Sequence, residues 1–179
     1  WEGSSKGSRG KCVVDTPEEL ARALEERRDQ AQPLLVEEFI AGEELTVGVV
    51  GNVRPRVIGV LRVVPLRHEP RFVYSLEVKR DYETRVRYES PPALPAPHIR
   101  ALEEAALLAY RALGCRDVAR IDFRLRDGVP YFLEANPLPG LNPVTSDLVI
   151  LARQNGLDHA GLVRGIVESA LERVELPVG

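Results

Sequence analysis

One stretch of alternating side chains, residues 119–136 (ARIDFRLRDGVPYFLEAN), constrains the fold of this chain more than any other. From residue 120 to residue 126, polar and apolar residues alternate strictly, which is the period of a β-strand with one buried face. The Asp127-Gly128 pair that follows is a hairpin signal, because both residues tolerate the left-handed backbone of a tight turn. The sequence therefore predicts two antiparallel strands, whose apolar face the rest of the chain must cover.

Two registers of this hairpin are possible. A two-residue loop, Asp127-Gly128, would place Asp122 opposite Leu133 and point Glu134 to the other face. A three-residue loop, residues 126–128, shifts every pair by one residue. We predict the three-residue loop because it separates apolar from polar residues more cleanly. It gathers one apolar face from Ile121, Phe123, Leu125, Val129, Tyr131 and Leu133.

In that register the opposite face collects the polar residues. It carries Arg120, Asp122, Arg124, Phe132, Glu134 and, farther along, Asn136. Carboxylate and amide oxygens are the ligands that Mg²⁺ prefers, with phosphate oxygens completing the octahedron, and a guanidinium suits a developing negative charge. The alternative is a solvated sheet face with an Arg–Glu cross-strand pair. The stiff NPLPG segment after it (136–140) favours a site, because it can present backbone N–H groups.

The rest of the pattern predicts an α+β protein in which strands and helices are mixed along the chain. We predict further strands at residues 11–14, 33–39, 45–51 and 56–66. We predict helices at residues 16–28, 97–113, 147–155 and 158–173. Residues 68–97 are polar and interrupted by prolines, so we expect extended segments and loops there.

Composition excludes several classes of protein. The chain has 179 residues and a net charge of −3, which argues against a nucleic-acid footprint. No apolar run approaches the roughly 20 residues of a membrane helix. The cysteines, Cys12 and Cys115, form no CxxC pair, so we expect no sulfur metal site and a cytoplasmic, reducing location. The sequence has no methionine, and we expect it to be a piece of a longer chain.

The opening segment, WEGSSKGSRGKC (residues 1–12), raises the question of a phosphate-binding loop. The P-loop motif is excluded: with Gly10-Lys11 as its Gly-Lys pair, Ser5 stands where the first glycine is needed and Cys12 replaces the Ser or Thr. The segment Gly3–Gly7 still supplies N–H and hydroxyl donors that can close over a phosphate. The alternative is a flexible Gly/Ser end.

A second candidate region lies at residues 34–47, LLVEEFIAGEELTV. Carboxylates at a predicted junction between strand and turn can accept hydrogen bonds from the amino and ribose hydroxyl groups of a nucleoside, and apolar neighbours can contact its base. The residues concerned are Glu37, Glu38, Glu43, Glu44, Phe39 and Ile40. The alternative is a solvated, acidic strand end.

Together these segments resemble the D-alanine–D-alanine ligase family of the ATP-grasp superfamily. The resemblance rests on EGSSKG, VEEFIAGEELTVGVVG, LEVK (76–79), GCRDVARIDFRL and FLEANPLPG, which recur in family order over nearly the whole chain. It implies two lobes with mainly antiparallel sheets flanked by helices and ATP between them. Residues 1–50 would form the small lobe, truncated at its N-terminus, and residues 51–179 the large lobe with the Mg²⁺-binding hairpin.

The resemblance also implies a reaction and a role for each matching residue. ATP would phosphorylate a carboxylate to an acyl phosphate, and an amine would then attack it to form a peptide bond in cell-wall peptidoglycan precursor synthesis. The implied nucleotide contacts are Ser4 and the catalytic Ser5 on the γ-phosphate, Glu37, Phe39, Ile40 and Glu44 on adenine and ribose, and Lys79 on phosphate. Two Mg²⁺ ions, replaceable by Mn²⁺, would bind Asp122, Glu134 and Asn136.

For the amino-acid substrates, the resemblance assigns Arg120 and the Gly140 N–H to the tetrahedral intermediate and Ser146 to the second amino acid's carboxylate. The loop 141–147 is unlike the family's usual sequence, so a ligase for other amino acids or peptides stays open, as does a nucleotide-binding module without catalysis. We expect the 179 residues alone to lack ligase activity. A homodimer of the full-length protein fits the family.

Overall fold

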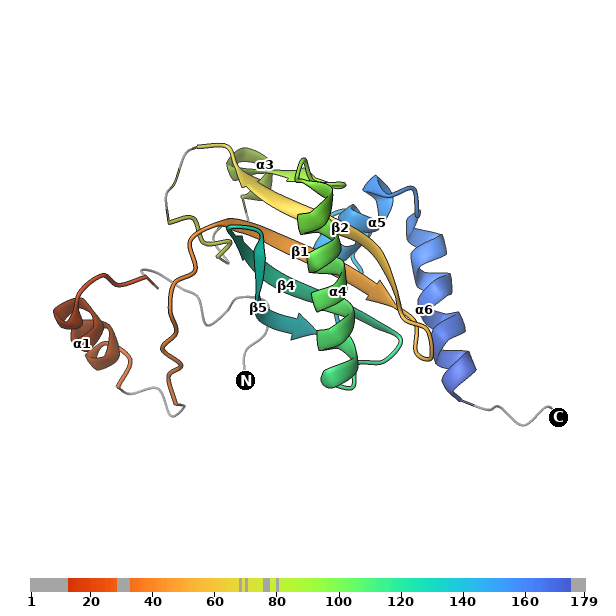
Figure 1. Cartoon of the computed structure of the whole chain (residues 1–179), viewed down its shortest axis with the longest axis horizontal. Helices are drawn as coiled ribbons and strands as arrows, with labels where there is room; N and C mark the ends of the chain where they lie inside the picture. The colour runs from red at the N-terminus through yellow and green to blue at the C-terminus, as the bar shows by residue number, and fades with distance from the viewer. Residues whose placement is uncertain are drawn as a thin grey trace.

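The computed structural model describes residues 13–28, 33–67, 69, 71–75, 78–79 and 81–174, and these form an α+β fold around one antiparallel sheet. The sheet has five strands in the order β3-β2-β1-β4-β5 (Figure 1). The strands are β1 (Glu43–Val50), β2 (Arg56–Pro65), β3 (Val86–Glu89), β4 (Val118–Arg126) and β5 (Val129–Asn136). The central strand, β1, is hydrogen-bonded on both sides, to β2 and to β4.

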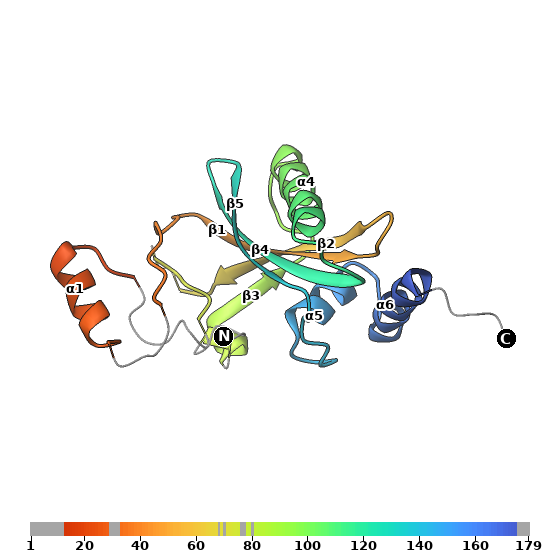
Figure 2. The same ribbon diagram turned by 90° about the horizontal axis from the view of Figure 1, so that it is seen from below.

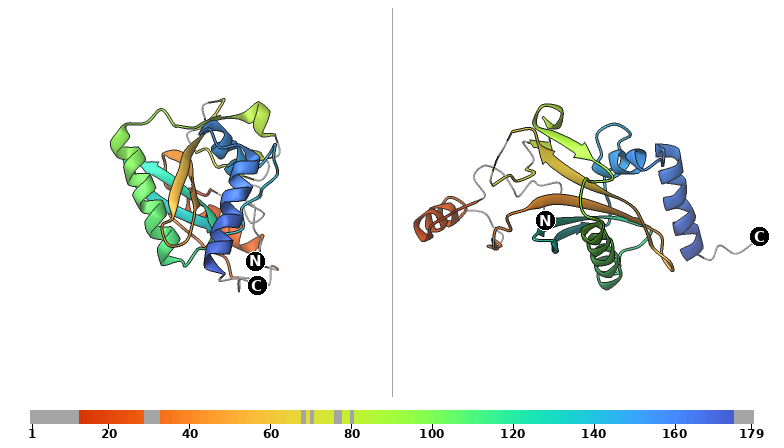
Figure 3. Two further views of the ribbon diagram at one scale, coloured as in Figure 1. Left: turned by 90° about the vertical axis from the view of Figure 1, so that its right-hand side faces the viewer. Right: turned by 45° about the horizontal axis from the view of Figure 1, so that its top comes forward.

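The helices form layers on the two faces of this sheet. They are α1 (Pro17–Glu25), α3 (Tyr82–Arg85), α4 (Ala96–Ala112), α5 (Asp147–Gln154) and α6 (His159–Arg173). Figures 2 and 3 show α4 on one face and α5 and α6 on the other. Helix α1 lies apart from the sheet and buries none of its residues. Among the described residues, no helix has both the length and the apolar character that crossing a membrane requires.

The core under α4 is built by the alternation of β1 and β4. Leu45 of β1 lies beside Phe123 of β4, and both point toward Leu102 of α4. Tyr110, also on α4, is fully buried and donates its hydroxyl to the Gly51 carbonyl at 2.8 Å. A 17-residue helix with apolar residues at helical spacing thus covers the apolar face that the sequence predicts.

The opposite face of the sheet divides into an apolar end and a polar end. At the apolar end, Leu61 of β2 and Val118 of β4 pack against Leu148 of α5. The glycine at position 48 permits this approach, because a Cβ there would lie only 2.8 Å from both Ile58 and Leu148. The close contact brings the first turn of α5 next to the polar end of the same face.

The β4–β5 hairpin corrects the predicted register. The loop has two residues, because Arg126 pairs with Val129, and Asp127 and Gly128 both have positive φ, as in a type I′ turn. A β-bulge then leaves Leu133 unpaired, so the pairs change from Phe123–Phe132 to Asp122–Glu134. The predicted three-residue loop is therefore wrong, yet the bulge still brings Asp122 and Glu134 together.

The same register corrects three side chains near the turn. Val129, predicted on the apolar face, pairs with Arg126 instead. Phe132 pairs with Phe123 rather than joining the polar face, and their rings are edge-to-face at 6.1 Å between centroids. Tyr131 pairs with Arg124, and its ring lies 4.6 Å from the Arg126 guanidinium. The turn type that matches the twist of the strands prevails over the cleaner apolar pattern.

Two other segments differ from the sequence prediction. Residues 33–41 and the described part of 11–14, Val13 and Val14, form no strand. In 33–41, Leu35 and Val36 are exposed. A strand needs a neighbour for its backbone groups, and the described residues provide none there. Conversely, residues 82–89 form α3 and β3, where we expected only extended segments and loops.

The predicted division into lobes at residue 50 stays a prediction. However, β1 ends at Val50 and pairs with both β2 and β4, so a boundary there would run through the sheet. We propose that any division between lobes lies before Glu43, since the segment from 33 to 41 forms no part of the sheet.

The first prediction tests the core under α4. Phe123→Ala is expected to lower the free energy of unfolding by about 3–5 kcal/mol, because a buried ring would be replaced by a cavity. Urea unfolding followed by circular dichroism measures this. As a control, Leu108→Ala on the exposed side of α4 should change the free energy by no more than about 0.5 kcal/mol. A loss below about 1 kcal/mol for Phe123→Ala would contradict the described core.

Candidate active site

The polar end of the sheet is organised around the Arg120 guanidinium on β4. Its Nε and Nη2 donate to the two oxygens of Asp122 at 3.0 and 2.8 Å, and its Nη1 donates to Asp147 at 3.1 Å. Glu134 lies 3.7 Å from Nη2. The side chains of Arg120, Asp122 and Asp147 are only 10–15% exposed, whereas that of Glu134 is 54% exposed. The cluster therefore has a buried base and an open side at Glu134.

Asp122 is the most shared carboxylate of this cluster. Besides Arg120, it accepts a hydrogen bond from the Thr46 hydroxyl of β1 at 2.5 Å. The Asn136 amide donates to Asp122 at 3.3 Å and to Glu134 at 3.0 Å. The sheet register explains this convergence, since Thr46 and Glu134 are the residues directly opposite Asp122 on its two neighbouring strands.

The surroundings shift the pKa of Arg120 and of two tyrosines, Tyr74 and Tyr88, that contact Asp147. Burial alone would lower the pKa of Arg120, but the carboxylates of Asp122 and Asp147 more than offset this and raise the pKa. The guanidinium therefore keeps its positive charge. Burial, reinforced by the Asp147 carboxylate, raises the pKa of both Tyr74 and Tyr88, so their hydroxyls stay protonated and act as donors.

A second buried ion pair lies next to this cluster on the same face. Arg124 Nη2 donates to Glu44 at 2.8 Å and also to the Phe72 carbonyl. Glu44 accepts in addition from the Tyr74 backbone N–H at 3.2 Å. Burial raises the pKa of Glu44, and the neighbouring Arg124 opposes that shift. Glu44, which we predicted as a nucleotide contact, is thus already bound to Arg124.

The other predicted nucleotide contacts lie around this pair. The Phe39 ring lies 5.1 Å from the Arg124 guanidinium, Ile40 is half-buried, and Glu37 is exposed. The ammonium of Lys79 lies 4.8 Å from the centre of the Tyr74 ring. Ser4 and Ser5 lie outside the described residues.

The loop after β5 holds the remaining predicted residues, Gly140 and Ser146. The Ser146 hydroxyl accepts the Asn142 N–H at 2.8 Å, and a Cβ at Gly140 would lie 2.8 Å from it. Arg153 of α5 donates to the Pro143 carbonyl at 2.6 Å. The loop is therefore held in one shape, with Gly140 beside Ser146.

The donor set at the open side of the cluster fits a divalent cation bound together with phosphate. Asp122, Glu134 and Asn136 supply two carboxylates and an amide on one face, and such hard oxygen donors suit Mg²⁺. The described residues contain no group of three or more His, Cys, Asp or Glu side chains placed to hold a metal ion. A cation here would thus need ligands from outside these side chains, as Mg²⁺ commonly takes from phosphates and water.

Comparison with known proteins connects this geometry to a family. A sequence profile described as "D-ala D-ala ligase C-terminus" matches residues 2–168. The chain belongs to the D-alanine–D-alanine ligase family. It is 36% identical over 170 residues to the D-alanine–D-alanine ligase of Desulforudis audaxviator and 35% identical over 170 residues to that of Geobacter sulfurreducens. These matches cover 92% and 94% of this chain, and the chain spans about half the length of these curated relatives (52% and 50%).

Solved structures of D-alanine–D-alanine ligases share the fold. The Bacillus anthracis enzyme complexed with ATP matches 89% of this chain with a TM-score of 0.70 and 28% identity, over 48% of its own length. The Coxiella burnetii enzyme matches 92% of the chain with a TM-score of 0.69, over 43% of its own length, and at 22% identity it supports the fold alone. The ATP-grasp fold predicted from the sequence is confirmed.

Sequence reasoning in this ligase-family chain missed several residues of the cluster. Thr46, Arg124 and Asp147 contact predicted site residues. Tyr74 contacts Glu44 and Lys79 directly, and Tyr88 reaches the cluster through Asp147. Thr46 and Arg124 had a usable signal, since both are polar at alternating positions that belong to the polar face. The two tyrosines had none, because their place depends on how residues 71–75 and β3 pack.

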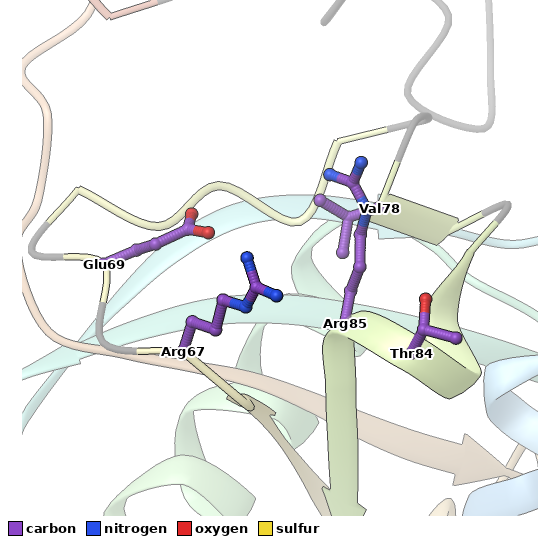
Figure 4. Close-up of a pocket in the computed structure, with 5 residues that line it drawn as sticks. All are labelled: Arg67, Glu69, Val78, Thr84 and Arg85. Atoms are coloured by element: carbon purple, nitrogen blue, oxygen red, sulfur yellow. The ribbon is translucent and has the colours of Figure 1, made fainter.

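A cavity among the described residues lies away from the Arg120 cluster. Figure 4 shows this cavity beside Arg67, which follows the end of β2 at Pro65. Its volume is about 370 Å³. It is lined by Arg67, Glu69, Val78, Thr84 and Arg85. The Glu69 carboxylate points toward the Arg67 side of the cavity, and Arg85 rises beside Val78. None of these residues belongs to the Arg120 cluster, so we base no function on this cavity.

The second prediction concerns the buried Arg124–Glu44 pair. Arg124→Met is expected to lower the free energy of unfolding by about 3–5 kcal/mol, because Glu44 would be left buried without its partner. Adding Glu44→Leu should restore most of that loss, since no unpaired charge then remains. Urea unfolding of the single and double variants measures both effects. The control Arg126→Met, which breaks the exposed pair with Glu38, should have a much smaller effect. A double variant as unstable as Arg124→Met would contradict this account.

Proposed function

We propose that this chain carries the catalytic face of an ATP-dependent carboxylate–amine ligase, a D-alanine–D-alanine ligase or a close relative in peptidoglycan precursor synthesis. The observation that carries the proposal is the cluster of Arg120, Asp122, Glu134 and Asn136 on one face of β4 and β5, in a chain of that family. A solvated sheet face would not need a guanidinium buried between two carboxylates. Because the chain spans about half of its relatives' length, the activity is proposed for the protein that contains it.

The proposed cofactors are ATP and two Mg²⁺ ions, which Mn²⁺ can replace. The ATP complex of the Bacillus anthracis relative supports the nucleotide, and the oxygen donors of Asp122, Glu134 and Asn136 would hold the metal. When bound, Mg²⁺ neutralises charge on the phosphate oxygens and the leaving group. Glu37, Phe39, Ile40 and Glu44 stay the proposed contacts to adenine and ribose.

In the proposed reaction, ATP phosphorylates the first substrate's carboxylate to an acyl phosphate, and the amine of the second substrate displaces phosphate to form the amide. The positive charges of Arg120 and Lys79 would stabilise the transferring phosphoryl group. Arg120 and the Gly140 N–H would then donate hydrogen bonds to the oxyanion of the tetrahedral intermediate. Ser146 is proposed to orient the second substrate's carboxylate.

One part of the proposal concerns residues that lie outside the described part of the chain. The serine loop, Gly3–Gly7, with Ser4 and the catalytic Ser5, is proposed to cover the γ-phosphate and exclude water from the acyl phosphate. The cytoplasmic location and the homodimer stay predictions. Amino acids are the proposed substrates.

A second candidate, a ligase for other amino acids or peptides, is favoured by the loop after Gly140. This loop adjoins Ser146, and it is held by Asn142 and Arg153 in a sequence unlike the one the family usually carries. Since the loop shapes the proposed site of the second amino acid, this candidate differs from the first in the amine that is joined. A screen of amino acids and dipeptides as acceptors separates the two candidates.

The third prediction tests the proposed chemistry in the full-length protein that contains this chain. Glu134→Gln should lower the rate of D-alanine-dependent phosphate release from ATP by about 100-fold or more, because one anionic metal ligand is lost. A coupled phosphate assay with Mg²⁺ measures it. The control Glu104→Gln, an exposed residue of α4, should keep the parent rate. The 179-residue chain alone should form no dipeptide.

Two results would contradict the proposal. If the Glu134→Gln variant kept the rate of the unmutated protein, the carboxylates of this face would take no part in the reaction. The second result is that the unmutated full-length protein binds ATP but releases no phosphate with any amino-acid or dipeptide acceptor. That result would instead support a nucleotide-binding module without catalysis.

A further inference from the structure

Asp147 is a largely covered carboxylate that the predicted site did not include. It is the first residue of α5, and its side chain is 10% exposed. Its Oδ2 accepts from Arg120 Nη1 at 3.1 Å, and its Oδ1 accepts from the hydroxyls of Tyr74 and Tyr88, both at 3.1 Å. One carboxylate thus joins β4, β3, α5 and the segment 71–75.

These contacts argue against Asp147 as a direct ligand of a substrate or a metal ion. Both of its oxygens already accept hydrogen bonds, and its three donors nearly enclose it. A substrate ammonium or a metal ion would have to displace a guanidinium or two protonated tyrosines. Its position at the start of α5 also places it beside the partial positive charge of the helix N-terminus. Asp147 is therefore a fixed anion directed at Arg120.

Arg120 has three anionic neighbours: Asp122 and Asp147, which accept its hydrogen bonds, and Glu134, which lies 3.7 Å from Nη2. Nε and Nη2 face Asp122, whereas Nη1 faces Asp147. A divalent cation bound by Asp122 would compete for the same carboxylate and would repel Arg120, because like charges a few ångströms apart interact strongly in a partly buried site. Glu134, the other carboxylate near Nη2, is a proposed ligand of the same cation, so Asp147 is the ion-pair partner that is left to hold Arg120.

We propose that Asp147 is a positioning residue that keeps the Arg120 guanidinium in place while Asp122 is engaged by a divalent cation. This inference rests on the proposed function, in which Asp122 is a metal ligand. The two tyrosines contribute by holding the Asp147 side chain in place. Tyr74 also links Asp147 to Lys79, because its ring lies against the Lys79 ammonium. The Asp147 carboxylate would thus help to position Arg120 and Lys79, the two cationic side chains that are proposed to contact phosphate.

The fourth prediction tests this with Asp147→Asn in the full-length protein. Asparagine can still accept the tyrosine hydroxyls through Oδ1, but it places an uncharged N–H₂ group toward Arg120. We expect turnover, kcat, to fall by about 10- to 100-fold with a KM for ATP within about twofold, and Mn²⁺ affinity to weaken by about tenfold. Mn²⁺ binding weakens because Arg120, without Asp147, competes more strongly for Asp122. Electron paramagnetic resonance of free Mn²⁺ measures the affinity.

A double-mutant cycle separates positioning from a general structural effect. In an Arg120→Met background, Asp147→Asn should change Mn²⁺ affinity by less than about threefold, because its effect passes through Arg120. The matched control is Asp158→Asn, since Asp158 caps the N-terminus of α6 and asparagine caps equally well. That control should leave turnover and Mn²⁺ affinity at the parent's values. If Arg120→Met does not fold, the separate kcat and KM effects of Asp147→Asn decide the question.

The outcomes distinguish this inference from the proposed function. Suppose that the unmutated full-length protein binds Mn²⁺ and is active, and that Asp147→Asn changes neither kcat nor the affinity for Mn²⁺. This result would overturn the role of Asp147 and leave the proposed function intact. An equal loss of affinity in both backgrounds would also overturn it. An altered preference among acceptor amino acids, with kcat kept for the preferred one, would make Asp147 a specificity residue instead. Parent protein that neither binds Mn²⁺ nor turns over would overturn both proposals.

Discussion

The antiparallel pairing of β1 with both β2 and β4 is the constraint on which the rest of this structure depends. Because β1 is central and its side chains alternate, one face of the sheet receives Leu45 and its neighbours and must be covered by α4. The other face receives Glu44 and Thr46, which lie beside Arg124 and Asp122 of β4. The polar face is thus a consequence of the same alternation that builds the core.

Burying several charges on that face is costly unless each one has a partner. The described residues meet this condition: no buried side-chain nitrogen or oxygen among them lacks a hydrogen bond. Arg120 lies between Asp122 and Asp147, and Arg124 binds Glu44. Such a network fixes the positions of its members, and this is the property that the proposed phosphoryl transfer and its metal ligands require.

Much of the fold could be predicted from the sequence, because the signals are local. The period of α4, the capping of α6 by Asp158 and the strands of the hairpin all follow from neighbouring residues. The strand predicted at 33–39 is wrong, since a strand exists only when a second strand pairs with it, and the described residues place none beside this segment. For the same reason, β3 was missed: its four residues carry little signal and are held by β2.

The sequence by itself determined which polar side chains the candidate site contains, because Arg120, Asp122, Glu134 and Asn136 all stand in the hairpin segment and in the family's motifs. Only the tertiary structure decided how they meet: a two-residue type I′ turn and a bulge at Leu133, rather than a longer loop, set the register. It also added Asp147, which lies 27 residues from Arg120 and reaches it only because α5 packs closely over Gly48. Local patterns fix which face a side chain takes, whereas contacts between distant segments depend on the packing of the whole chain.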